Sequence, residues 1–425
     1  MIYKKLPHTN IEVSKICLGT MTWGRQNSEE EGHQQMDYAV DQGINFFDTA
    51  ELYPIPAHPD RYADTEKIIG NWFKNTGKRE KIILGSKIAG KADFTKFIRS
   101  TGFRKESLVE AVEGSLERLQ TDYIDLYQLH WPERSTNYFG KRGYQHDLTD
   151  HWQDNIHQVL ETLRDLINAG KIRHVGLSNE TPWGTMRFLE ESKVHSSLPR
   201  MITIQNPYNL LNRQFEVGLS EISIRENIGL LAYSPLGFGV LSGKYMGGMK
   251  PANARITLFP AYSRYSSDNA NRATQEYYEL AREHNLSLTK MALAFVNSRP
   301  FVTSNIIGAT SMKQLEENIS SIEVDLSDER VSEIESIHNT IPDSSPLIEV
   351  SGFNILISWC ETSCVSLEGG LCLTERQSWF TTSSILDTNS IFIFVFFRAI
   401  LLFFETKIFE NPSLSASRIL CSTLC

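Results

Sequence analysis

Four side chains in the first third of the sequence have the types and spacing needed to transfer a proton. Asp48, Lys87 and His130 each end a short apolar run, and they are separated by 39 and 43 residues. Each interval fits one strand followed by one helix, so parallel strands would place the three side chains at the same edge of a sheet. Tyr53 follows Asp48 by five residues and can reach the same place. The spacing therefore predicts an acid–base centre.

The chemistry expected of this group is proton donation by a tyrosine. A free phenol ionises near about pH 10, and a neighbouring ammonium favours the phenolate, so we expect Lys87 to lower the pKa of Tyr53. Asp48 would keep Lys87 charged and oriented, while His130 would donate a hydrogen bond to a substrate oxygen. A positioned general acid commonly contributes a rate factor of about 10² to 10⁴.

Each of these residues also has an ordinary structural interpretation. A strand-end Asp often caps a helix or a turn, and a strand-end Lys is usually solvated. Tyr53, which precedes Pro54, could simply pack its loop, and His130 could be a structural imidazole. The repeated spacing favours the functional interpretation over these alternatives.

The strands needed to position such a centre are indicated by short apolar runs that recur along the sequence. Amphipathic stretches lie between the runs, for example the four leucine and valine positions at 108, 112, 116 and 119. The pattern predicts a (β/α)8 TIM barrel with an N-terminal β-hairpin over residues 1 to about 18. An open doubly wound sheet is the main alternative, but residues 19–24 are not a G-x-G-x-x-G turn. The eight predicted strands are residues 16–19, 45–48, 82–87, 124–130, 172–178, 202–207, 229–234 and 303–308.

Two long connections and a change of composition complete the predicted organisation. The connections, about 131–151 and 238–271, follow strands and should lie at the C-terminal face of the barrel, where active sites form. We assign residues 1–345 to the barrel and interpret residues 346–425 as a disordered or non-native extension. An apolar run at 391–404 makes a membrane tail anchor an alternative, but it is shorter than the roughly 20 residues that span a bilayer.

Charge and cysteine content narrow the class of protein. The 425 residues carry a net charge of −9, with no basic run suited to a phosphate backbone, so no nucleic-acid partner is expected. Cys17 is the only cysteine before residue 347, which is typical of a cytoplasmic protein without disulfides. No metal site is expected, because the histidines at 146, 151 and 157 lack the helical pairing of a metal hydrolase.

Two segments resemble the signatures of the aldo-keto reductase superfamily. Residues 43–53 (GINFFDTAELY) resemble the first signature and residues 115–132 (SLERLQTDYIDLYQLHWP) resemble the second. The resemblance extends over about residues 1–340, and GTMT at 19–22 with QNPYNLLNR at 205–213 makes the chain most similar to the bacterial Tas-like branch. It implies an NADP-dependent oxidoreductase that reduces aldehydes or ketones, with Tyr53 as the acid in a tetrad with Asp48, Lys87 and His130.

The same resemblance implies where the cofactor NADPH would bind. GLSN at 176–179 and Gln205 would hold the carboxamide, AYSPLG at 232–237 would stack on the nicotinamide, and residues 308–318 would receive the adenosine phosphate. A helix start there suits an anion, although Ser311 and Gln314 could equally form a capping box. Preference for the 2′-phosphate would depend on Ser311 and Lys313 or on neighbours that the sequence does not locate. The cofactor residues implied are Gly19, Thr20, Met21, Asp48, Ser178, Asn179, Gln205, Tyr233, Ser234, Pro235, Leu236, Gly237, Lys244, Gly308, Ser311, Gln314, Glu317 and Asn318.

The expected partner is a small-molecule carbonyl compound, and the sequence does not indicate an oligomeric state. Trp23, Tyr53, His130 and Trp131 are the expected substrate residues, with Met21 and the aromatic residues at 138 and 139 as further wall candidates. The alternative function is a nicotinamide-binding, redox-sensing regulatory subunit that resembles the potassium-channel β subunits of the same superfamily. Turnover of a carbonyl substrate would separate the two hypotheses.

Overall fold

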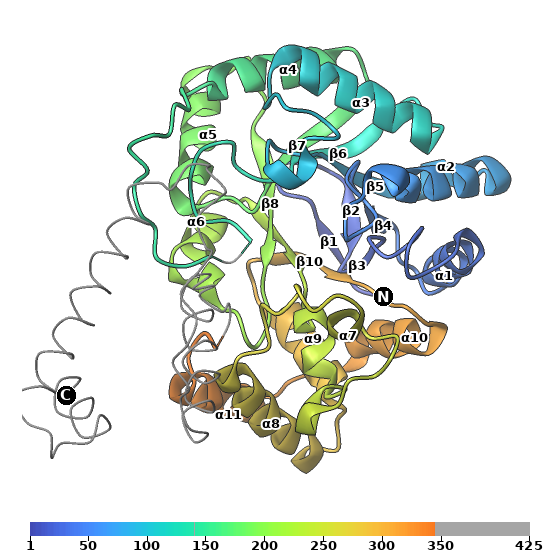
Figure 1. Cartoon of the computed structure of the whole chain (residues 1–425), viewed down its shortest axis with the longest axis vertical. Helices are drawn as coiled ribbons and strands as arrows, with labels where there is room; N and C mark the ends of the chain where they lie inside the picture. Colours follow the sequence, from blue (N-terminus) through green and yellow to red (C-terminus); the bar gives the residue numbers. More distant parts are fainter. Residues whose placement is uncertain (140, 345–425) are drawn as a thin grey trace, which may run out of the picture. The chain divides into compact units, whose positions relative to one another are not determined.

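Eight parallel strands close into a barrel (Figure 1). The computed structural model describes residues 1–139 and 141–344. The strands run in the order β10-β3-β4-β5-β6-β7-β8-β9, and β9 pairs with β10 to complete the ring. The predicted (β/α)8 barrel is confirmed, and every predicted strand end lies within one residue of the observed end. The strands are β3 Ile16–Gly19, β4 Phe46–Asp48, β5 Ile83–Ile88, β6 Ile124–Leu129, β7 Ile172–Ser178, β8 Met201–Pro207, β9 Gly229–Tyr233 and β10 Val302–Ile307.

The predicted N-terminal hairpin packs against the barrel interior. It consists of β1 Tyr3–Lys5 and β2 Glu12–Ser14, paired antiparallel. Two apolar residues that flank its turn, Leu6 and Val13, are fully buried in one cluster with Cys17 and Phe46. Because side chains alternate along a strand, Phe46 faces this inner cluster whereas Phe47 packs outward against helices. The hairpin thus supplies apolar side chains to the inner layer of the barrel.

Helices separate successive strands and cover the outside of the barrel (Figure 1). Local sequence sets their ends: Ser28, for example, forms a capping box with Glu31 at the start of α1. Close packing also depends on Gly70, because a Cβ there would lie 2.1 Å from the carbonyl oxygen of Arg118. The helices are α1 Glu29–Asp41, α2 Asp64–Thr76, α3 Lys105–Leu119, α4 Ile156–Asn168, α5 Pro182–Val194, α6 Leu219–Arg225, α7 Arg255–Leu258, α8 Asp268–Glu283, α9 Leu288–Ser298, α10 Met312–Ser320 and α11 Asp328–Thr340.

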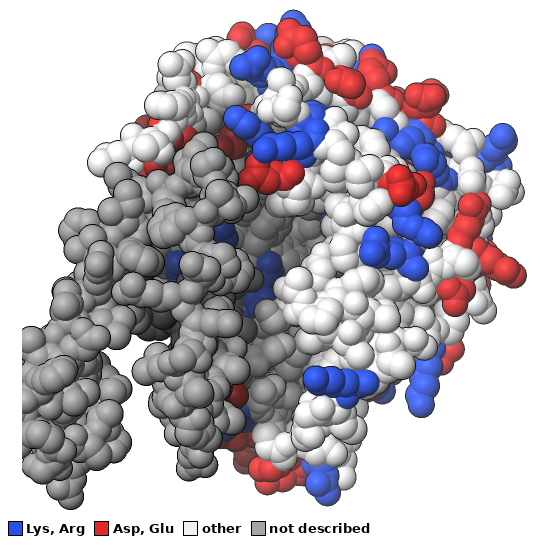
Figure 2. All heavy atoms as spheres, viewed as in Figure 1, with Lys and Arg blue, Asp and Glu red and all other residues white. Residues whose placement is uncertain are grey.

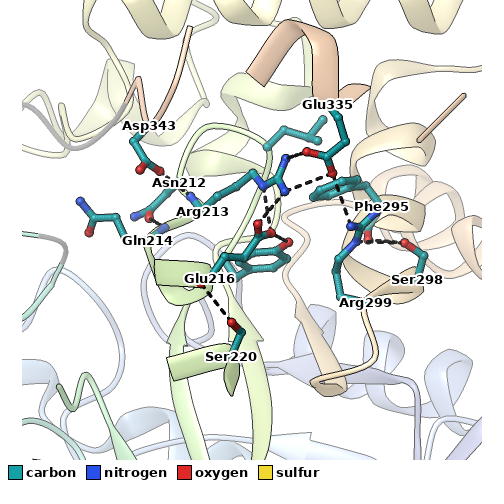
Figure 3. Close-up of polar contacts among 12 residues, drawn as sticks. Asn212, Arg213, Gln214, Glu216, Ser220, Phe295, Ser298, Arg299, Glu335 and Asp343 are labelled. Atoms are coloured by element: carbon teal, nitrogen blue, oxygen red, sulfur yellow. Dashed lines mark hydrogen bonds and ion pairs between the residues drawn. The ribbon is translucent and has the colours of Figure 1, made fainter. Parts of the chain in front are cut away.

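A buried arginine ties the last described helix to the barrel (Figure 3). Arg213 follows β8, and its guanidinium contacts Glu216 Oε2 and Glu335 Oε2, each at 2.6 Å. Its backbone N–H donates to Asp343 Oδ1 at 2.9 Å, and its side chain lies over the Phe295 ring. Three segments far apart in the sequence are therefore held together by one side chain.

The long connections leave the C-terminal ends of β6 and β9, as predicted. The second contains only short helical turns and α7 before α8 begins. Within the described part of the chain, no helix has both the length and the apolar character needed to cross a membrane. The apolar run at 391–404 and the predicted extension at 346–425 lie outside the described residues, so these two predictions stay open.

Charged side chains are dispersed on the face of the molecule drawn in Figure 2. Lys and Arg side chains lie among Asp and Glu side chains on this face. The visible described surface therefore offers no continuous basic track of the kind that follows a nucleic-acid backbone.

Candidate active site

The carboxyl ends of β4, β5 and β6 bring the four predicted proton-transfer residues together. Asp48 ends β4, Lys87 lies in β5, and His130 directly follows β6. Lys87 Nζ donates hydrogen bonds to Asp48 Oδ2 and to the carbonyl oxygen of Thr49, both at 2.7 Å. Tyr53 lies in the connection after β4, with its ring centroid 5.0 Å from Lys87 Nζ and 5.9 Å from the His130 ring centroid. The convergence expected from the spacing is thus observed.

Two glutamine side chains hold the buried carboxylate of Asp48 from the other side. Gln205 Nε2 donates to Asp48 Oδ1 at 2.8 Å, and Gln128 Nε2 donates to the same oxygen at 3.3 Å. Both oxygens of Asp48 therefore have donors, and the side chain of Lys87 below the cavity is fully buried. Gln128 was not predicted, because a strand residue facing the barrel interior has no distinctive sequence signal. Gln205 was expected at the cofactor, and it contacts Asp48 here.

Burial governs the ionisation of Tyr53. Burial raises the pKa of its phenol, and this effect outweighs the opposing influence of the Lys87 ammonium. The expectation that Lys87 lowers this pKa is therefore wrong for the net direction, because it considered the charge and not the loss of water around the hydroxyl. Burial also opposes the charge of Lys87, but Asp48 and Tyr53 together raise the pKa of that amine. The pair consequently holds a charged amine beside a protonated phenol.

His130 is held as a neutral imidazole. Burial, together with the nearby Lys87 charge, lowers the pKa of His130 well below its ordinary value. Its Nδ1 has no hydrogen-bond partner among the described residues, whereas its backbone oxygen accepts a bond from Asn179 Nδ2 at 2.9 Å. A neutral imidazole has one N–H donor and one acceptor, so it can donate to a ligand oxygen without carrying charge.

A cavity of about 1200 Å³ opens over these residues at the C-terminal face. It is large enough for an extended ligand, since typical small-molecule pockets measure about 300 to 1,000 Å³. The predicted residues that line it are Gly19, Thr20, Met21, Asp48, Tyr53, His130, Ser178, Asn179, Gln205, Tyr233, Ser234, Pro235, Leu236, Lys244, Gly308, Ser311, Gln314, Glu317 and Asn318.

One end of the cavity, next to His130, is lined by polar groups from β7 and β9. Ser178 Oγ donates to the carbonyl oxygen of Gln205 at 2.9 Å, and Tyr233 Oη donates to Asn179 Oδ1 at 2.6 Å. Asn179 has a φ of 53°, a left-handed conformation that asparagine tolerates better than most residues. These bonds fix the amide of Asn179 beside the proton-transfer centre.

The start of α10 forms the other end of the cavity. Ser311 caps the helix by accepting a hydrogen bond from the Gln314 backbone N–H at 3.4 Å. Gln314 Oε1 accepts from the Thr310 N–H at 2.9 Å, so it does not return to the cap residue as a complete capping box would. Asn318 Nδ2 donates to Gly308 O at 3.1 Å and closes the turn. The helix end faces the cavity with its positive dipole end.

Three of the predicted positions lie elsewhere. Trp23 is completely buried and donates from Nε1 to Gln35 Oε1 at 3.2 Å. The prediction that it forms a wall of the substrate pocket is therefore corrected. Trp131 is 1% exposed and packs behind Tyr53 and Ala89 without lining the cavity. Gly237 is buried below the lining. Periodicity could not predict which way the two tryptophan side chains point, because both residues lie outside the regular helices and strands.

Of the two loop aromatics considered as wall candidates, Phe139 lines the cavity. Tyr138 packs edge-on against the Phe139 ring instead, with the two ring centroids 5.1 Å apart. The loop after β6 therefore contributes one aromatic wall residue and one packing residue.

Sequence reasoning missed two arginines in the connection after β9. Arg255 and Arg264 line the cavity, and no described carboxylate lies within ion-pair distance of either. Burial lowers the pKa of Arg255, and burial together with Arg255 lowers the pKa of Lys244. Three cations therefore face one cavity without an ion pair to a described carboxylate, and only Lys244 has an acid of the lining, Glu317, near enough to oppose the lowering of its pKa. The length of this connection was a signal, but nothing in its sequence selected the two arginines.

Comparison with known proteins agrees with this architecture. Residues 15–339 match the model of the Aldo/keto reductase family. The chain is 49% identical over 353 residues to Protein tas of Escherichia coli (strain K12), a match that covers 81% of this chain and 100% of that protein. It is 40% identical over 253 residues to an aldo-keto reductase of Babesia bovis, covering 56% of this chain and 88% of the relative.

A more distant relative is named for a different role. The chain is 28% identical over 355 residues to a probable voltage-gated potassium channel subunit beta of Oryza sativa subsp. japonica, covering 80% of this chain and 98% of that protein. The predicted kinship with the Tas-like branch is confirmed by the higher identity to the bacterial protein. A barrel of this topology, matched by the family model over most of its length, places the chain in the aldo/keto reductase family.

Proposed function

We propose that the protein reduces aldehydes and ketones to alcohols with NADPH, and that Tyr53 is the general acid. The observation that carries this proposal is the position of the phenol, which lines the cavity while its ring lies 5.0 Å from the buried ammonium of Lys87. Family membership supports nicotinamide-dependent oxidoreduction in general.

The residues divide the work between proton transfer and orientation. NADPH, when bound, would supply the hydride that adds to the carbonyl carbon of the substrate. Tyr53 Oη gives its proton to the carbonyl oxygen, and Lys87 stabilises the phenolate that this transfer leaves. Asp48 holds Lys87 in place, and the neutral His130 can donate a hydrogen bond to the same substrate oxygen. The raised pKa of Tyr53 keeps its proton available at neutral pH.

The cavity suits a dinucleotide with charged phosphates. Lys244, Arg255 and Arg264 face it without forming an ion pair to a described carboxylate, and burying such charges is costly unless an anion binds there. The start of α10 offers further N–H groups to a phosphate. At the other end, we expect the amide of Asn179 to bind the carboxamide and the ring of Tyr233 to stack on the nicotinamide, since both residues line the cavity.

Preference for NADPH over NADH would come from a cation near the start of α10. Lys313 does not line the cavity, whereas Arg282 of α8 does, together with Ser287, which bonds Glu317 at 2.7 Å. We assign the 2′-phosphate to Arg282 and Ser311.

Arg282→Ala should weaken NADPH binding about tenfold, measured by tryptophan fluorescence, and leave NADH binding unchanged. Lys313→Ala is the matched control, and an equal loss for both nucleotides would contradict the assignment.

The alternative is a regulatory subunit that binds the nucleotide as a redox sensor, as the name of the rice relative suggests for that protein. Steady-state oxidation of NADPH with a nitrobenzaldehyde decides between them, on the full chain and on a chain truncated after Pro346. We expect multiple turnovers with both. Tight nucleotide binding without turnover would favour the sensor.

The proposed location is the cytoplasm. The only cysteine among the described residues, Cys17, is a buried free thiol, as expected where disulfides do not form. The proposed partner is a small-molecule carbonyl compound.

A further inference from the structure

A cluster of two histidines and one glutamate lies between α4 and α5, in residues that the proposed reaction does not use. His157 lies in the first turn of α4, Glu191 in the last turn of α5, and His195 directly after α5. Their potential ligand atoms all lie within 4.8 Å of one another. We propose that this cluster binds a divalent transition-metal ion, with Zn²⁺ the best match.

The three donors surround one position. His157 Nδ1 is 2.6 Å from Glu191 Oε1, and His195 Nε2 is 3.3 Å from the same oxygen. Zinc binds imidazole nitrogen and carboxylate oxygen at about 2.0 to 2.2 Å, so neighbouring ligands of a tetrahedral ion lie about 3.3 Å apart. The His195 distance already has this value, and His157 must move away from Glu191 by about 0.7 Å. A fourth position stays open for water.

The surroundings support the same three groups. His157 Nε2 points toward Glu161, 3.9 Å from its Oε1, so a carboxylate can orient the imidazole whose Nδ1 faces the cluster. The second oxygen of Glu191 accepts a bond from Arg187 Nη1 at 2.5 Å, and Arg187 is itself held by Asp154 at 2.8 Å. Glu191 Oε1 is thereby presented as a single-oxygen ligand.

Access and ligand type also fit a metal ion. The side chain of Glu191 is 11% exposed, whereas those of His157 and His195 are 38% and 46% exposed, so an ion can enter from the solvent side. Two imidazoles and a carboxylate suit zinc, nickel and copper better than calcium or magnesium, which prefer oxygen ligands. None of the three residues lines the catalytic cavity, so the expected role is to link α4 to α5.

The alternative to a metal site is a metal-free bridge, in which the two imidazoles only form hydrogen bonds to Glu191. The experiment must exclude this alternative. Zn²⁺ should be titrated into the full-length protein by calorimetry, after its accessible thiols have been alkylated, because the five cysteines beyond residue 347 could also bind zinc. The variants are His157→Gln and His195→Gln. His151→Gln, which changes an exposed histidine outside the cluster, is the matched control.

We expect one zinc ion per chain, binding at least tenfold weaker in both cluster variants and unchanged in the control. Zinc should raise the Tm of the native chain by a few degrees and of neither cluster variant, while nitrobenzaldehyde reduction stays equal in all of them. Equal zinc affinity in the native chain and in His195→Gln would overturn the proposal. Lower metal-free Tm values with unchanged zinc affinity would also overturn it, in favour of the bridge.

Discussion

Two of the buried positive charges of the barrel have contrasting surroundings: Lys87 lies beneath the cavity and Arg213 lies beside the last described helix. Lys87 has one carboxylate partner, Asp48, and a carbonyl acceptor, Thr49, and it lies beside the phenol of Tyr53, which lines the cavity. Arg213 has two carboxylate partners, Glu216 and Glu335, and none of the three lines the cavity (Figure 3).

The two cations differ in whether all the groups around them are already paired. Burial opposes the charge of Arg213, yet hydrogen bonds to Glu216 and Glu335 raise its pKa. The network is internally complete, so its effect is to hold segments together. In the proposed reaction, the Lys87–Asp48 pair instead stabilises the negative charge that forms on Tyr53 when its proton leaves. A buried ion pair therefore indicates chemistry only when a reactive group beside it has access to a ligand.

Removing Lys87 should produce the largest combined effect, because it damages both chemistry and folding. Lys87→Met leaves the carboxylate of Asp48 buried without its cation, which costs about 3 to 5 kcal/mol of unfolding free energy. The reduction rate should also fall by a factor of about 10² or more, because the phenolate loses its neighbour. Urea denaturation and steady-state kinetics measure the two losses. A variant with normal rate would remove Lys87 from the mechanism.

The matched substitution at Arg213 should affect only the stability of the fold. Arg213→Met leaves Glu216 and Glu335 without a cation and should lower the free energy of unfolding by about 3 to 5 kcal/mol. Under conditions where the variant is folded, the reduction rate should change less than about twofold, because Arg213 does not touch the cavity. A rate loss comparable to that of Lys87→Met would show that Arg213 and Lys87 do not differ in this way.

The pH dependence should give the smallest effect, and its sign follows from the shifts at the site. The pKa of His130 is well below its ordinary value and that of Tyr53 is raised, so the reduction rate should be insensitive to both groups between about pH 6 and 9. It should fall only as the pH rises through the Tyr53 pKa.

The free energy of unfolding should decrease as the pH falls below about 6.5, because His130 binds a proton there in the unfolded chain and stays neutral in the folded chain. A rate transition near neutral pH that disappears in His130→Gln would contradict the assigned neutral imidazole.

The sequence predicted the ring of strands because a parallel barrel repeats one unit, so strand ends at positions 48, 87 and 130 had to share one face. It could not predict that Trp23 turns inward, because that direction depends on a tight turn between Trp23 and Asn27. Arg255 and Arg264 were missed since their place depends on the path of a connection without periodicity. Burial of Tyr53, which reverses the expected direction of its pKa shift, is likewise a property of the packed structure.

The most direct test is the rate of NADPH oxidation with a nitrobenzaldehyde by Tyr53→Phe, with NADPH affinity measured on the same sample. Phenylalanine keeps the ring against Lys87 and His130 and removes only the proton donor. We expect kcat to fall by a factor of about 10² to 10⁴ with unchanged NADPH binding. A kcat within about threefold of the native value would show that Tyr53 is not the general acid.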